Sequence, residues 1–143
     1  MGRPPQAAVI AADLLARLEA QLANAYCPYS KFQVAAVVED DQGGLHAGCN
    51  VENAAYPIGN CAEVSALAAM IAAGGARRAR TVYVTAETAG TRIAVQPCGA
   101  CRQRIAELAS PEGCEVVMVG SGGSMERVTL AALLPNAFSL PHP

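Results

Sequence analysis

Two short segments carry the residues of this sequence whose types and spacing are best suited to chemistry. They are Cys61-Ala62-Glu63 and Pro97-Cys98-Gly99-Ala100-Cys101, and each lies at the start of a predicted helix. Cys98 and Cys101 are three residues apart, so on a first helical turn both sulfurs can reach one ion. The positive end of a helix dipole also favours thiolates over thiols. With Cys61 as a third sulfur, the pattern predicts a bound Zn²⁺ ion.

The position of Glu63 favours a catalytic metal site over a structural one. Three protein ligands leave the fourth position of tetrahedral zinc open for water, and the metal lowers the pKa of that water towards neutrality. A carboxylate beside the water is then needed to move its protons. Glu63 follows Cys61 by two residues and is predicted to be this catalytic residue.

The Cys-x-x-Cys spacing has two other interpretations, a redox dithiol and half of a structural zinc site. A redox dithiol does not explain a Cys-x-Glu segment at the start of another helix. A structural site needs a fourth ligand, and the remaining candidates are better explained as ordinary buried thiols or isolated imidazoles. These candidates are Cys27, Cys49, Cys114, His46 and His142.

Hydrophobic periodicity predicts the elements that must position these residues. Ile10, Leu14, Leu18 and Leu22 recur every four residues and indicate an amphipathic helix over 7–24. Two more helices and a short last one are predicted over 61–73, 97–108 and up to 134. Strands are predicted over 32–38, 45–51, 81–86, 115–119 and 125–128, with a loop over 53–60.

This order of elements predicts an α/β fold. We expect three α/β/α layers, with helices on both faces of a mixed five-stranded sheet. No linker, repeat or low-complexity tract divides the chain, so residues 1–143 are predicted to form a single catalytic domain. The turn Ser121-Gly122-Gly123-Ser124 is too short for a parallel crossover, so the last two strands should run antiparallel.

Composition excludes several classes of partner. The formal net charge is −2 and there is no block of basic residues, so a nucleic acid polymer is not an expected partner. The cluster Arg77-Arg78-Ala79-Arg80 fits a solvated helix end better than a phosphate site. No apolar run is long enough to span a bilayer, and Met1–Pro5 lacks the apolar core of a signal peptide. We therefore expect a cytoplasmic protein with no membrane partner.

Taken together, the motifs resemble those of the small homotetrameric cytidine deaminases, over Tyr26 to Phe138. The segments that carry the resemblance are Pro28–Val34, Asn50–Tyr56, Cys61–Glu63, Pro97–Gln103 and Leu133–Phe138. The resemblance implies a cytidine-deaminase-like fold and a homotetramer with shared active sites. It implies zinc-dependent hydrolysis of the C4 amine of cytidine or deoxycytidine, which gives uridine or deoxyuridine and ammonia in pyrimidine salvage.

The resemblance also implies roles for substrate-binding residues. Asn50 and Glu52 would hydrogen-bond the ribose 3′ hydroxyl, which an amide and a carboxylate can satisfy in a desolvated pocket. Phe32 would lie against the pyrimidine ring, and the backbone of Ala62 would bind the edge of the base. Residues that would reach into the active sites of neighbouring subunits are Ala54, Tyr56 and Phe138.

One position departs from the family pattern in a way that concerns the metal. The family usually has arginine after Cys-Ala-Glu, where it donates hydrogen bonds to the thiolates, and this chain has Val64. Zinc with three thiolates carries a net charge of −1, which opposes ionisation of bound water. Arg102 and Arg104, which follow Cys101, are candidates for the compensating cation.

Two alternative functions remain open from the sequence. One is deamination of a modified cytosine nucleoside or of a blasticidin-like antibiotic, although the stretch Asn50–Asn53 favours the cytidine deaminases over the blasticidin-deaminating relatives. The other is a zinc-binding module that has lost catalysis. The presence of Glu63 argues against the second alternative.

Overall fold

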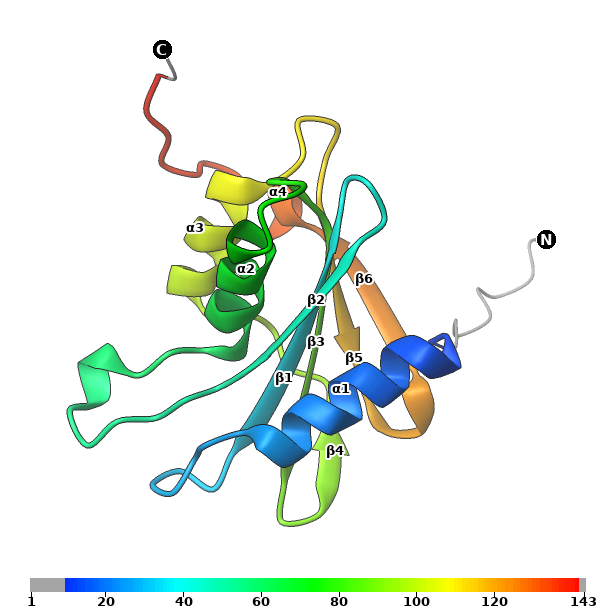
Figure 1. Ribbon diagram of the computed structural model, residues 1–143, viewed down its shortest axis with the longest axis vertical. Coiled ribbons are helices and arrows are strands. Elements are labelled where there is room, and N and C mark those ends of the chain that lie inside the picture. Colours follow the sequence, from blue (N-terminus) through cyan, green and yellow to red (C-terminus); the bar gives the residue numbers. More distant parts are fainter. Residues whose placement is uncertain (1–9, 142–143) are drawn as a thin grey trace.

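A computed structural model describes residues 10–141 of the chain. A mixed sheet with strand order β2-β1-β3-β5-β6 forms the middle layer, and helices cover both of its faces (Figure 1). The strands are β1 (Gln33–Asp40), β2 (Leu45–Cys49), β3 (Ala79–Thr88), β4 (Thr91–Ile93), β5 (Glu115–Val119) and β6 (Met125–Thr129). The helices are α1 (Ala12–Asn24), α2 (Ala62–Ala72), α3 (Gly99–Leu108) and α4 (Leu130–Leu133), with 3-10 turns at Tyr56–Ile58 and Ser121–Gly123. The predicted three-layer α/β/α architecture is confirmed.

Helix α1 covers one face of the sheet alone. Its buried residues Leu14, Leu18 and Leu22 pack against Val37 of β1 and its neighbours, as the four-residue spacing predicts. The helix begins at Ala12 rather than at position 7, because Ala11 is extended, and residues 7–9 lie outside the described residues. Ile10 is buried but precedes the helix, and its N–H donates to Gly123 O.

Helices α2, α3 and α4 share the other face, and a second apolar core lies beneath them. This core includes Leu67 and Met70 of α2, Ile105 of α3, and Val82 and Val84 of β3. Small residues allow α2 to approach the sheet closely. A Cβ atom at Gly48 of β2 would overlap the backbone nitrogen of Ala66, so only glycine permits this contact. The close approach fixes the start of α2 over the sheet.

The sheet contains one strand more than predicted. Strand β4 has three residues and pairs antiparallel with the end of β3. The two strands are joined through Ala89 and Gly90, both with positive φ, which suits a tight hairpin. Strands β5 and β6 pair antiparallel across the short glycine turn, which confirms the prediction, whereas β3 and β5 run parallel.

Within residues 10–141, none of the helices combines the length and the apolar character needed to cross a bilayer.

Candidate active site

Three thiols converge where the N-termini of α2 and α3 meet. Cys61 is the N-cap of α2, Cys98 is the N-cap of α3, and Cys101 lies in the first turn of α3. Their sulfur atoms all lie within 4.8 Å of one another. Tetrahedral zinc with Zn–S bonds of about 2.3 Å requires sulfurs roughly 3.8 Å apart, so small side-chain rotations suffice to bind one ion. The cluster therefore fits zinc.

One thiol of the cluster has a lowered pKa even without a metal ion. Cys101 hydrogen-bonds Cys61, which lowers the pKa of Cys61 to about 6 and raises the pKa of Cys101. Cys101 is fully buried, whereas Cys61 is half-buried and Cys98 is exposed. One of the three sulfurs thus ionises readily at neutral pH, and a divalent cation favours loss of the remaining protons because only thiolates bind zinc well.

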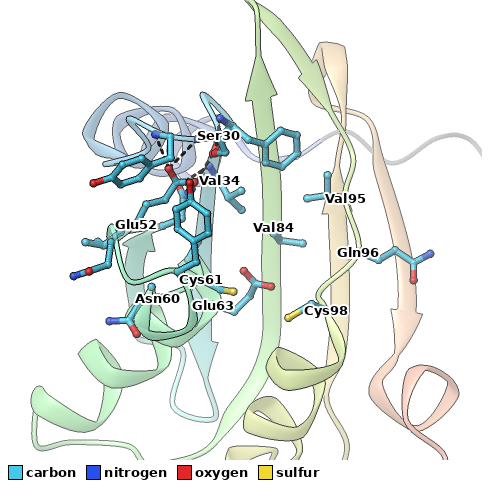
Figure 2. A pocket seen from close by; sticks show the side chains of 18 residues that line it. Ser30, Val34, Glu52, Asn60, Cys61, Glu63, Val84, Val95, Gln96 and Cys98 are labelled. Carbon is cyan, nitrogen blue, oxygen red and sulfur yellow. Dashed lines mark hydrogen bonds between the residues drawn. The ribbon is translucent and has the colours of Figure 1, made fainter.

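Glu63 lies in the first turn of α2, beside the thiols. Figure 2 shows its carboxylate directed into the pocket, between the side chains of Cys61 and Cys98. Glu63 is only 4% exposed. Burial raises the pKa of Glu63, and a hydrogen bond with Cys101 offsets part of that rise. A carboxyl group with a raised pKa is suited both to accept and to return a proton near neutral pH.

A pocket of about 620 Å³ opens above Glu63, Cys61 and Cys98. The four residues predicted to bind substrate within the same chain line it, namely Phe32, Asn50, Glu52 and Ala62. Tyr56, which was predicted to reach a neighbouring site, lines the pocket of its own chain. Ala54 and Phe138 do not line it, and Phe138 is 69% exposed elsewhere on the surface. Glu52 and Glu63 are the charged side chains among the described residues that line the pocket, and no cation accompanies them there.

Asn50, which follows β2, is bonded to the start of β1 through its side-chain amide. Its Oδ1 accepts a hydrogen bond from Val34 N at 2.9 Å, and its Nδ2 donates to Phe32 O at 2.8 Å. Strand β2 ends at Cys49, one residue before Asn50 and two residues earlier than predicted. The N–H of Asn50 still donates to Val34 O at 3.2 Å, so the amide adds to the backbone pairing with β1 and fixes the backbone that carries Phe32.

Glu52 is oriented by the loop that precedes β1. Its Oε1 accepts hydrogen bonds from Tyr29 N and Ser30 N, both at 3.1 Å, as the dashed lines in Figure 2 show. Hydrogen bonds from the Ser30 side chain and backbone, with that of Tyr29, keep the pKa of Glu52 below its usual value. The carboxylate therefore stays ionised and directed towards the pocket at neutral pH.

Several pocket residues were not found by sequence reasoning. Tyr29 contacts Tyr56 edge to face, with ring centroids 5.7 Å apart. Asn60, Val84 and Val95 also line the pocket. Tyr29 belongs to a segment that carries the resemblance, so its type and position gave a signal. Val95 gave none, because it follows β4, which the sequence did not reveal.

In this α/β/α fold, a Cys-x-Glu segment and a Pro-Cys-x-x-Cys segment meet at the starts of two helices. This arrangement is that of the zinc-dependent deaminases, and Cys61 takes the position where many of them have histidine. The comparison with family models agrees. The chain belongs to the cytidine and deoxycytidylate deaminase zinc-binding family, whose model matches residues 11–118.

Individual relatives give the same family. The chain is similar to the cytidine deaminase of Sporosarcina psychrophila, with 41% identity over 126 residues that cover 88% of this chain and 89% of that protein. It is also similar to the cytidine deaminase of Halalkalibacterium halodurans, with 42% identity over 116 residues and coverage of 81% and 84%. The crystal structure of cytidine deaminase from Burkholderia pseudomallei matches with a TM-score of 0.77 and 40% identity, over 88% of this chain and 97% of that chain.

Proposed function

We propose that this protein hydrolyses the exocyclic amine at C4 of cytidine or deoxycytidine, which yields uridine or deoxyuridine and ammonia. The observation that carries the proposal is the burial of Glu63 beside three convergent thiols at the base of the pocket. The family match and the named relatives support the same reaction. We place the reaction in cytoplasmic pyrimidine salvage, where thiols are kept reduced and able to bind metal.

Cys61, Cys98 and Cys101 are the residues that would hold zinc, with one sulfur from α2 and two from α3. When bound, zinc supplies Lewis acidity that lowers the pKa of water in the fourth position. The backbone of the two helix starts directs its N–H groups towards this region, which favours the negative charge of the thiolates.

Glu63 carries the proton transfers in the proposed mechanism. Its carboxylate accepts a proton from the attacking water and delivers it to N3 of the pyrimidine ring. It then carries the second proton of that water to the amine that leaves from C4. One group acts first as a base and then as an acid, and burial, which raises the pKa of Glu63, suits it to both steps.

The remaining pocket residues are proposed to hold the nucleoside. Asn50 and Glu52 would bind the ribose 3′ hydroxyl, Phe32 would pack against the ring, and the backbone of Ala62 would bind the base edge. Glu52 and Glu63 are the charged residues of the pocket lining, and Lys31, whose charge helps to keep the pKa of Glu52 low, is not part of that lining. The negative lining disfavours a 5′-phosphate by charge repulsion. The charge of the pocket thus supports a nucleoside rather than a nucleotide substrate.

An ammonia-release assay across cytosine, cytidine, deoxycytidine 5′-phosphate and blasticidin S tests this proposal. We expect turnover of cytidine at a rate well above that of the other three compounds. Preference for blasticidin S would support the antibiotic alternative. Zinc-loaded protein that releases no ammonia from any of the four would support the catalytically silent module.

Arg104 is the better candidate for the cation that compensates for Val64. Arg102 is not free for this role, because its guanidinium binds the carbonyl oxygens of Pro97 and Leu133. Besides the hydrogen bond from Cys101, the charge of Arg104 is among the influences that lower the pKa of Cys61. We therefore assign the compensating charge to Arg104, on the exposed side of α3.

Arg104→Ala is expected to reduce cytidine turnover by up to about fivefold, the limit for an exposed charge screened by solvent. Steady-state kinetics at low and high salt check this, with Arg104→Lys retaining most activity and exposed Arg77→Ala as the matched control. Adding Val64→Arg to Arg104→Ala should recover part of the loss. Unchanged turnover of Arg104→Ala at low salt would show that charge compensation at the thiolates does not limit the reaction.

We also propose a homotetramer with shared active sites. Large apolar side chains are exposed beside the pocket, with Tyr56 72% and Ile58 66% exposed, and Ala68 and Ala72 are exposed on α2. Light scattering at assay concentration should give the mass of four chains. Replacing Ile58 with Glu should shift the protein towards smaller, less active species, whereas Glu112→Gln, a surface control, should not. A fully active monomer would contradict the shared-site proposal.

A further inference from the structure

Two consecutive side chains of α3, Arg102 and Gln103, hold the end of α4 and the segment that follows it. The first is Arg102, whose Nη1 donates to Leu133 O at 3.0 Å, at the end of α4. Its Nε donates to Pro97 O at 2.9 Å, and its Nη2 donates to Gln96 Oε1 at 3.1 Å. Arg102 therefore fixes the peptide before Cys98 and the start of the C-terminal segment to the same helix.

The second side chain is Gln103, which binds both backbone groups of Phe138. Gln103 Nε2 donates to Phe138 O at 2.8 Å, and Phe138 N donates to Gln103 Oε1 at 3.1 Å. A pair of this kind restrains the backbone on both sides of the Phe138 Cα atom. It therefore sets the direction in which the phenyl ring leaves the chain. Figure 1 shows this C-terminal segment running past α3 and away from the body of the subunit.

The ring held in this way has little contact with its own subunit. Phe138 is 69% exposed, and the next apolar residue, Leu140, is 67% exposed. Single exposed apolar residues are common. Phe138 differs from such residues because its backbone is held in place. Ordering this segment costs conformational entropy, and the exposed ring gains no burial in its own subunit that would offset the cost. Holding the backbone of Phe138 is useful if the ring packs against another molecule.

We propose that Gln103 is a positioning residue that presents Phe138 to the pocket of a second copy of this chain. The second copy is the occupant that fits, since Phe138 lies outside its own pocket, whose mouth is bordered by the exposed rings of Tyr29 and Tyr56. Gln103 thus acts on the substrate in the neighbouring subunit and not on the substrate bound above its own helix. This inference rests on the proposed shared active sites.

Subunit exchange distinguishes the effect of a Gln103 variant on the pocket of its own subunit from its effect on the pocket of the neighbouring subunit. A small fraction of wild-type subunits is exchanged into an excess of Glu63→Gln subunits, so that activity arises in wild-type pockets with variant neighbours. The excess subunits carry, in parallel preparations, Gln103→Met, Gln103→Glu, Phe138→Ala or Glu107→Gln in addition. Gln103→Met keeps the side-chain length and removes both hydrogen bonds, and Gln103→Glu places an oxygen against Phe138 O. Glu107→Gln changes an exposed residue one turn further along α3 and is the matched control.

We expect Gln103→Met in the neighbour to raise the KM for cytidine about tenfold in the wild-type pockets, the equivalent of roughly 1.4 kcal/mol. The kcat should change less than twofold, because Glu63 and the thiols of the measured pocket are intact. Gln103→Glu should raise KM at least as much, Phe138→Ala should do the same, and Glu107→Gln should have no effect. Zinc content and tetramer mass of the Gln103 variants should match those of the wild type.

Two results would overturn the inference and are distinguishable. If Phe138→Ala raises KM in the neighbour while both Gln103 variants leave it unchanged, Gln103 does not position the ring, although the shared sites stand. If Phe138→Ala also leaves KM unchanged, the shared-site proposal itself is wrong.

Discussion

Glu63→Gln is expected to reduce the kcat for cytidine by at least about 100-fold, the lower end of the contribution of general acid–base catalysis. Glutamine keeps the size and position of the side chain but cannot accept the proton of the attacking water. The zinc content should stay at about one ion per chain, because the three sulfurs are unaffected. Since the buried carboxyl group is replaced by a neutral amide, stability should be kept or raised.

Steady-state kinetics, with metal analysis of the same preparation, measure this effect. Glu87→Gln is a suitable control, because it makes the same chemical change on the same sheet outside the pocket. Near-normal turnover by zinc-loaded Glu63→Gln protein would mean that another group moves the protons. Loss of zinc together with activity would instead make Glu63 part of the metal site.

Cys98→Ser is expected to remove most of the zinc and, with it, nearly all deaminase activity. Serine is a poor zinc ligand, because its hydroxyl stays protonated at neutral pH, and two remaining sulfurs hold the metal weakly. Cys98 is exposed, so the substitution should disturb packing less than a change at buried Cys101. Any loss of activity is then attributable to the metal.

Metal analysis of purified Cys98→Ser and Cys27→Ser variants checks this prediction. Cys27 is a half-buried thiol outside the cluster, so its replacement should leave zinc unchanged. Full zinc content in Cys98→Ser would show that the metal is held elsewhere. Zinc loss in Cys27→Ser would show that the cluster of three sulfurs is not the complete ligand set.

Local sequence patterns predicted the elements around the candidate site well. The four-residue spacing of Leu14, Leu18 and Leu22 is a direct consequence of helix geometry, and the short glycine turn leaves β5 and β6 only an antiparallel arrangement. The cysteine spacings predicted that three sulfurs would meet, and the structure brings them together. The resemblance to cytidine deaminases is confirmed by the family match.

What the sequence did not predict depends on contacts between distant segments. Strand β4 has three residues, too few for an alternating pattern, and it forms because a tight turn returns the chain alongside β3. The resemblance implies a role for Asn50 towards substrate only, whereas its amide also bonds the backbone of Phe32 and Val34. Such bonds are made to backbone atoms, which no side-chain pattern reveals.

The two arginines after Cys101 are a second case in which the sequence alone did not predict the contacts of a side chain. Both follow the motif closely, and both are candidates from the sequence for the cation that compensates for Val64. Their environments in the structure differ, because Arg102 is bound to the carbonyl oxygens of Pro97 and Leu133 and Arg104 is exposed. Two positions along a helix rotate a side chain by about 200°, so Arg102 and Arg104 point in nearly opposite directions from α3.

This chain is proposed to convert cytidine to uridine with zinc held by Cys61, Cys98 and Cys101. The most direct measurement follows uridine and ammonia from cytidine before zinc is removed by a chelator, after removal, and after one equivalent is returned. We predict equal amounts of the two products, loss of turnover on removal and recovery on return. Protein that binds one zinc ion through these cysteines and forms no uridine from cytidine would contradict the account.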